Sequence, residues 1–83
     1  MKKRNQTEKP KPHPEPYLRC AKGLGVLPGE CVVIENAPLG VESAKSAGMT
    51  CIALTSTMKR EDLGRADFII DDLREVLGII RKL

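Results

Sequence analysis

The fold of this chain is decided by residues 30–49, which read Glu30-Cys-Val-Val-Ile-Glu-Asn-Ala-Pro-Leu-Gly-Val-Glu-Ser-Ala-Lys-Ser-Ala-Gly-Met49. The short apolar run at 31–34, rich in β-branched residues, predicts a buried parallel strand. Pro38 then suits the first turn of a helix, because its φ is already helical and it has no N–H to leave unpaired. Ligands of open α/β sheets bind beyond the carboxyl ends of the strands, and Glu35 and Asn36 fall at that point.

The segments around this unit predict an alternation of helices and strands. A helix is expected from about residues 14–16 to Gly25, and a second from Pro38 to about Ala47, where Gly48 ends it. Residues 50–55 form the next apolar run and predict a second buried strand. Two strands joined by a helix of this length form a βαβ unit, so the sheet is expected to be parallel.

The C-terminal part of the chain predicts one more strand and two helices. A short helix is expected within 57–66 and a strand at 67–70. A final amphipathic helix, capped by Asp71 or Asp72, is expected to bury a stripe formed by Val76, Leu77, Ile79, Ile80 and Leu83. The predicted fold class is therefore α/β: a three-layer Rossmann-like half-domain with a short parallel sheet of about three strands and flanking helices.

Composition limits the size of the core. A chain of 83 residues accommodates one small domain, and a domain of this size leaves roughly 40 per cent of its surface exposed. The cysteines Cys20, Cys31 and Cys51 are odd in number and have no C-x-x-C spacing, so we expect reduced core residues of a cytoplasmic protein rather than disulfides or metal ligands. The apolar runs are too short for a membrane span, and no signal peptide is predicted.

Basic charge is concentrated at the N-terminus. The first eleven residues carry five basic side chains against Glu8 alone, which predicts a disordered basic arm at 1–10 followed by one domain at 11–83. The arm has no interleaved aromatic residues for stacking on bases. A small basic nucleic-acid-binding protein is therefore the weakest of the functions considered. His13, which lies between prolines, is expected to be a solvent-facing spacer.

Three segments together resemble a known family. They are Lys11-Pro-His-Pro-Glu-Pro-Tyr17, Gly29-Glu-Cys-Val-Val-Ile-Glu-Asn-Ala-Pro-Leu-Gly40 and Ala44-Lys-Ser-Ala-Gly-Met49. In this order and at these separations they resemble the C-terminal part of haloacid dehalogenase (HAD) superfamily hydrolases, in the β-phosphoglucomutase-like branch. The resemblance covers nearly everything from Lys11 onward.

The resemblance implies a magnesium-dependent phosphatase or phosphomutase site acting on a phosphorylated small molecule. In that family a nucleophilic aspartate near the start of the chain attacks a phosphate ester and forms an aspartyl-phosphate. Carried over to this sequence, Lys11 would be the catalytic lysine that pairs with the nucleophile and the phosphoryl oxygens. Glu35 and Asn36 would occupy the acidic pair that binds Mg²⁺. The substrate's identity does not follow from the sequence.

Two departures from the family pattern bear on activity. The Asp-x-Asp pair that carries the nucleophile is absent from these residues, as are the second family motif and the helical cap domain, so the isolated chain is expected to be inactive. Asn36 stands where the family usually has aspartate. An amide still offers an oxygen to Mg²⁺ but brings no negative charge, so weaker metal binding is expected.

Several alternatives remain open at this stage. The chain could complement a HAD segment that supplies the nucleophile, or it could be a non-catalytic remnant or an oligomerising interaction module. Glu35 and Asn36 could instead satisfy backbone N–H groups at the start of the next helix. The strand at 31–34 would present an unpaired edge in this fragment, which favours a homo-oligomer or pairing with a complementary HAD fragment.

Overall fold

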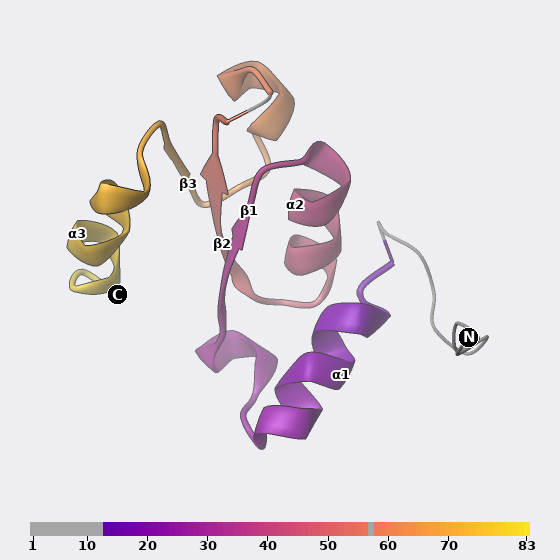
Figure 1. The fold of residues 1–83 in the computed structure, drawn as a ribbon. Helices are drawn as coiled ribbons and strands as arrows, with labels where there is room; N and C mark the ends of the chain where they lie inside the picture. The colour runs from indigo at the N-terminus through magenta and orange to yellow at the C-terminus, as the bar shows by residue number, and fades with distance from the viewer. Residues whose placement is uncertain (1–12, 57) are drawn as a thin grey trace, which may run out of the picture.

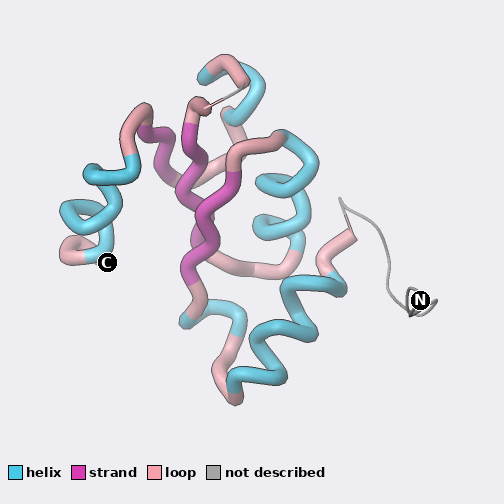
Figure 2. The backbone as a smooth tube through the Cα atoms, in the orientation of Figure 1, coloured by secondary structure: helices cyan, strands magenta, loops and turns pink. Residues whose placement is uncertain are grey.

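A small parallel sheet organises the protein. The computed structural model describes residues 13–56 and 58–83, so the predicted arm at 1–10 and Lys11 lie outside the described residues. The sheet has the order β1 (Val32–Glu35), β2 (Thr50–Leu54) and β3 (Phe68–Ile70), and both pairings are parallel. The strands run side by side at the centre of the molecule (Figure 2).

Helices flank this sheet on two sides. Figure 1 shows α1 (Glu15–Leu24) and α2 (Pro38–Ser46) on one side and α3 (Val76–Ile80) on the other. The connections contain three short 3₁₀ helices, η1 (Pro28–Glu30), η2 (Arg60–Leu63) and η3 (Leu73–Glu75). The predicted α/β class, with three layers and a short parallel sheet, is confirmed.

Local sequence signals account for the ends of the first two helices. Pro38 occupies the first turn of α2, as predicted, and Gly48 follows the helix with a φ of +78°. Gly25 ends α1 with a φ of +71°, where its N–H donates to Ala21 and Lys22 carbonyls. Both glycines are in the left-handed region that other residues avoid, so each helix ends where the sequence predicts.

The core lies between the sheet and α2. Its fully buried members are Val41 and Ala44 of α2, Cys51 and Ala53 of β2, and Leu63. Tyr17 of α1 packs against this cluster and also against a second one formed by Ala21, Ala47 and Met49. Tyr17 therefore joins the two parts of the core, in which small residues allow α2 to lie close to the strands.

The prediction that β1 is buried is wrong for one of its faces. Val32 and Ile34 are 39% and 47% exposed, whereas Val33, on the opposite face, packs against the core. Within the described residues, β1 lies at an edge of the sheet and pairs with β2 alone. An apolar run therefore marks a strand here without implying that both of its faces are covered.

The predicted stripe on the final helix is also wrong. Leu77 and Leu83 are 64% and 60% exposed, Ile80 is exposed as well, and Val76 and Ile79 are only half-buried. The reason is that α3 is only five residues long and packs chiefly against η3, which precedes it. The predicted capping pair of Asp72 and Glu75 is present, but it caps η3: the Asp72 carboxylate accepts a hydrogen bond from the Arg74 N–H, and the Glu75 carboxylate accepts one from the Asp72 N–H. The N-cap of α3 itself is Glu75, and no side chain caps it.

Two smaller predictions need correction. The helix expected within 57–66 is only the 3₁₀ turn η2, since Gly64 and the turn after it lead directly into β3. Cys20 is exposed rather than in the core, because it lines an open pocket beside β1; Cys31 is half-buried, Cys51 is buried, and all three thiols are free. Among the described residues, no helix has the length and apolar character needed to cross a membrane.

Candidate functional site

Polar side chains gather where the parallel strands end. Glu35 is the last residue of β1 and Asn36 follows it, while Thr55 and Ser56 follow β2. The side-chain amide of Asn36 donates from Nδ2 to Ser56 Oγ at 3.2 Å, which ties the ends of the two strands together. The edge at which α/β folds bind ligands therefore carries a carboxylate and an amide, with the Ser56 hydroxyl beside them.

The Glu35 carboxylate is held by contacts from two elements. The Tyr17 hydroxyl, on α1, donates to Glu35 Oε2 at 2.6 Å, and the Asn36 N–H donates to Oε1 at 3.1 Å. The carboxylate also lies against Gly40 of α2, where an added Cβ would overlap it. Position 40 therefore requires glycine, because a side chain there would occupy the space that the Glu35 carboxylate fills.

Tyr17 is built to act as a donor toward Glu35. Burial raises the pKa of the Tyr17 phenol well above its ordinary value, and the hydrogen bond to the Glu35 carboxylate raises it further. The hydroxyl therefore keeps its proton at neutral pH and remains a hydrogen-bond donor there. No local sequence pattern indicates this role, because the hydrogen bond joins residues that are 18 positions apart.

The alternative interpretation is that Glu35 and Asn36 satisfy backbone N–H groups at the start of the next helix, α2. The N-cap of α2 is Ala37, and no side chain caps it. Glu35 does accept a hydrogen bond from a backbone N–H, but that group belongs to Asn36, one residue before the cap. The alternative is therefore right for Glu35 only in part, and it does not describe Asn36, whose amide donates to Ser56.

The residues present fit a hard cation as a partial ligand set. A carboxylate and an amide oxygen are ligands that Mg²⁺ accepts, and Mg²⁺ often takes only one or two carboxylates and keeps several waters. The space at Gly40 holds the Glu35 carboxylate at the end of β1 without burying it completely. Within residues 13–56 and 58–83, no group of three or more His, Cys, Asp or Glu side chains could hold a metal by itself.

Other predicted residues have structural roles or lie outside this region. His13 is exposed, as expected of a spacer, and its carbonyl accepts a 2.5 Å hydrogen bond from the buried Ser43 hydroxyl. This bond fixes the end of the N-terminal segment to α2. Lys11, the predicted catalytic residue, lies outside the described part of the chain.

A second polar cluster closes the same edge of the sheet near β3. The Thr55 hydroxyl donates to Asp71 Oδ1 at 2.6 Å, and Arg60 Nη1 donates to both Asp71 oxygens at 3.1 and 3.2 Å. The hydrogen bond from Thr55, followed by the charge of Arg60, lowers the pKa of the Asp71 carboxyl. Arg60 also donates to the Ile69 carbonyl, so this cluster fixes η2 against the end of β3.

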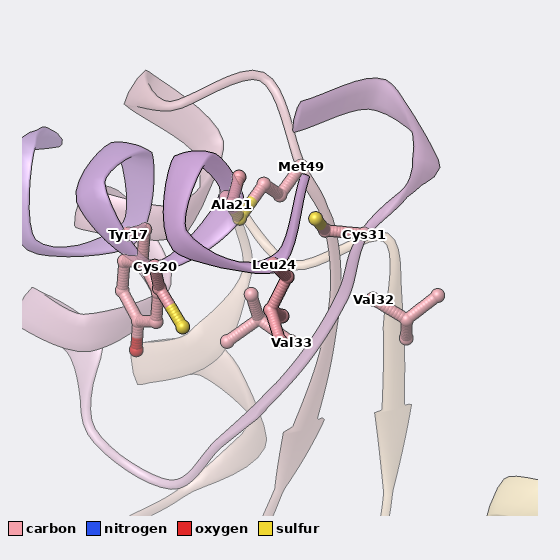
Figure 3. Close-up of a pocket in the computed structure, with 8 residues that line it drawn as sticks. All are labelled: Tyr17, Cys20, Ala21, Leu24, Cys31, Val32, Val33 and Met49. Carbon is pink, nitrogen blue, oxygen red and sulfur yellow. The ribbon is translucent and has the colours of Figure 1, made fainter. Parts of the chain in front are cut away.

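An apolar pocket of about 220 Å³ lies between α1 and β1 (Figure 3). Its lining residues are Tyr17, Cys20, Ala21, Leu24, Cys31, Val32, Val33 and Met49. The Tyr17 ring forms part of the wall, while the hydroxyl of the same residue bonds to Glu35. The pocket therefore adjoins both the open edge of β1 and the polar site, a relation that sequence spacing could not reveal.

Comparison with known proteins gives consistent matches. The family model of haloacid dehalogenase-like hydrolases matches residues 1–54. Validoxylamine A 7'-phosphate phosphatase of Streptomyces hygroscopicus subsp. limoneus is 44% identical over 66 residues, which cover 80% of this chain and 31% of that protein. Hexitol phosphatase A of Escherichia coli strain K12 is 39% identical over 66 residues, with the same two coverages of 80% and 31%.

The fold matches that of solved relatives equally well. A β-phosphoglucomutase from Clostridium difficile superposes with a TM-score of 0.82 at 32% sequence identity, covering 93% of this chain and 34% of that one. The chain thus spans about a third of the length of the relatives that it matches.

Proposed function

The chain belongs to the haloacid dehalogenase-like hydrolase family, in its β-phosphoglucomutase-like branch, and from this premise we propose that it forms part of a magnesium-dependent phosphatase or phosphomutase site. The observation that carries the proposal is the Glu35 carboxylate, held at the carboxyl end of β1 with Asn36 beside it. The named relatives act on phosphorylated compounds, which supports a phosphorylated small molecule as the substrate.

Three residues are proposed to contact the cation or the phosphoryl oxygens. Glu35 and Asn36 would hold Mg²⁺ through a carboxylate and an amide oxygen. When bound, the cation neutralises charge that spreads over the phosphoryl oxygens. Lys11 would add a positive charge next to the same oxygens. Tyr17 and Gly40 keep the Glu35 carboxylate in place, and Ser56 accepts from the Asn36 amide nitrogen, so that the amide oxygen is the group left to face a ligand.

We further propose that the nucleophile is supplied by a segment outside these residues. The sequence contains no Asp-x-Asp pair, and its aspartates are Asp62, Asp67, Asp71 and Asp72. Asp67 and Asp71 are engaged by Lys45 and Arg60, and Asp72 caps η3. These residues therefore have structural partners and do not form the family's nucleophile motif.

The test is an activity assay with the isolated chain and a complementing segment. We expect no Mg²⁺-dependent hydrolysis of a phosphate monoester by the 83 residues alone. Addition of a family segment containing Asp-x-Asp should produce turnover, and Lys11→Ala or Glu35→Gln should remove it. Lys22→Ala, which changes an exposed lysine at the end of α1, is the matched control and should leave turnover unchanged. Turnover by the chain alone that disappears in Lys11→Ala would contradict the proposal.

The partner is proposed to be a strand that pairs with β1. Within the described residues β1 has a neighbour on one side only, its Val32 and Ile34 side chains are exposed, and the apolar pocket adjoins it. Unpaired strand edges recruit other chains, and apolar burial adds roughly 25 cal/mol per Å². The strand would come from a second copy of this chain or from a complementary HAD segment.

Sedimentation velocity tests this association. The isolated chain is expected to form dimers at high micromolar concentration, and Val32→Lys is expected to shift it toward the monomer, because a charge on an edge strand opposes pairing. Leu77→Lys places the same charge on the exposed face of α3 and serves as the control. A folded wild-type monomer at high micromolar concentration would contradict edge pairing.

A non-catalytic interaction module is the second candidate function. Asn36 favours it, because an amide in the metal pair weakens cation binding, and so does the pocket beside the open edge of β1. The complementation assay separates the two candidates, since a module would bind the added segment without turnover. The three free thiols support a reducing, cytoplasmic compartment for either candidate.

A further inference from the structure

We infer that Tyr17 is a positioning residue for the cation site, and that its hydroxyl orients the Glu35 carboxylate toward the carboxyl edge of the sheet. The inference rests on the proposed function, because it takes Glu35 to be a cation ligand. Tyr17 itself would not touch the cation. Its contribution would be to hold one oxygen of the ligand, so that the carboxylate is already in place when a cation arrives.

The geometry restricts the carboxylate from several sides. Tyr17 lies on α1 and Glu35 on β1, yet their oxygens are 2.6 Å apart in a partly buried contact. The Asn36 N–H engages the other carboxylate oxygen, and Gly40 of α2 closes a third side. An ionised carboxylate oxygen has two lone pairs, so a hydrogen bond that it accepts does not by itself prevent it from binding a cation.

The position of the Tyr17 ring does not depend on its hydroxyl. The ring packs against both core clusters and forms part of the pocket wall. A phenylalanine at this position keeps that packing and removes only the hydroxyl group. Tyr17→Phe therefore isolates the hydroxyl, and the fold of the variant can be verified from the dispersion of its amide NMR spectrum.

Outer partners of metal ligands have a measurable signature. Removing a hydrogen bond that orients a ligand typically weakens metal affinity by about 10–100-fold. A hydroxyl that served only the fold would change stability and leave the cation affinity of the folded chain unaltered. Cation affinity, measured without any substrate or turnover, therefore distinguishes a positioning role from a structural one.

The experiment titrates the folded chain with Mn²⁺ as a paramagnetic substitute for Mg²⁺ and follows broadening of the Asn36 and Glu35 amide signals. Tyr17→Phe is expected to raise the Kd for Mn²⁺ about tenfold. Thr55→Val is the matched control, since it removes another 2.6 Å hydroxyl-to-carboxylate bond, to Asp71, and should change the Kd by less than about twofold. Mg²⁺ should reverse the broadening.

Each outcome has a definite meaning. An unchanged Kd in Tyr17→Phe, with binding lost in Glu35→Gln, would overturn the positioning role and leave the proposed site standing. An unchanged Kd in Glu35→Gln, or no saturable broadening in the wild-type chain, would overturn the cation site and this inference with it. An equal weakening in Tyr17→Phe and Thr55→Val would also overturn it, because the effect would then not be specific to Glu35.

A second variant, at Gly40 of α2, acts on the same carboxylate. An alanine at Gly40 places its Cβ where the Glu35 carboxylate lies, so the carboxylate must leave Tyr17. We expect Gly40→Ala to weaken Mn²⁺ binding, and the double variant with Tyr17→Phe to bind about as weakly as Gly40→Ala alone. Gly23→Ala, on α1 with open space around it, is the control. Independent, additive losses would overturn the inference.

Discussion

Replacement of Asp67 by alanine is expected to lower the free energy of unfolding by about 2 kcal/mol, because it leaves a buried backbone donor without its acceptor. Asp67 Oδ2 accepts hydrogen bonds from the Cys51 N–H at 2.7 Å and from Lys45 Nζ at 2.8 Å. Cys51 is fully buried in the central strand, and its carbonyl accepts from the Asp67 N–H at 2.9 Å. Urea unfolding followed by circular dichroism measures the loss as a lower midpoint.

The matched variant is Asp67→Asn, which keeps an oxygen for the Cys51 N–H and removes only the charge. Its cost should be at most about 1 kcal/mol, since the ion pair with Lys45 is partly exposed. An Asp67→Ala variant no less stable than Asp67→Asn would show that the Cys51 N–H does not depend on this carboxylate. The Lys45 side chain should keep its position in both variants, because its ammonium group also donates to the Met49 carbonyl at 3.1 Å.

The Asp67 carboxylate is also expected to make the protein less stable in acid. Burial by itself would raise the pKa of Asp67, but the hydrogen bonds from Lys45 and the Cys51 N–H outweigh it and hold the pKa below its ordinary value. Because the folded-state pKa is lowered, the ionised Asp67 carboxylate stabilises the fold fully above the unfolded-state pKa of about 3.9. This stabilisation is lost as the pH falls through the folded-state pKa. The Asp67→Asn variant should therefore lose less stability than the wild type between about pH 5 and pH 2.

Local signals explain why the first half of the fold was predictable. An apolar run, a proline in the first turn and a glycine after the last each act within a few residues, and together they give β1, α2 and β2 within a residue or two. Exposure is different, because it depends on which elements cover a face. The sequence marks Val32, Ile34 and Leu77 as apolar, but their exposure follows from the position of β1 at the sheet edge and from the shortness of α3.

For the site, the sequence predicts the location but not the contacts. The end of an apolar run places Glu35 and Asn36 at the carboxyl edge of the sheet, and the structure has them there. The contacts that orient them join distant residues: Tyr17 and Glu35 are 18 positions apart, and Asn36 and Ser56 are 20 apart. Such pairs form only when α1 docks on the sheet and β2 aligns with β1, so no local sequence pattern predicts them.

Asn36→Asp is expected to strengthen Mg²⁺ binding by about 30-fold. At an effective dielectric constant of about 20, one added unit charge about 4 Å from a cation contributes on the order of 4 kcal/mol before desolvation, and each 1.4 kcal/mol is about tenfold in affinity. We take about half of the Coulomb energy to remain after the carboxylate and the cation lose water. The contact with Ser56 would survive with its direction reversed, because the Ser56 hydroxyl can donate to a carboxylate.

Isothermal titration with Mg²⁺, and separately with Ca²⁺, measures this gain. Ser46→Asp is the control, because it adds the same charge at an exposed position in the last turn of α2, at the opposite end of that helix from Asn36. A nonspecific effect of net charge would raise affinity in both variants, whereas a site at the carboxyl edge responds to Asn36→Asp alone. Combining Asn36→Asp with Glu35→Gln should return affinity toward the wild-type value, since the added carboxylate would then replace the one that was removed. Equal and negligible heats for the wild type and Asn36→Asp would mean that these two side chains bind no cation and only connect the ends of β1 and β2.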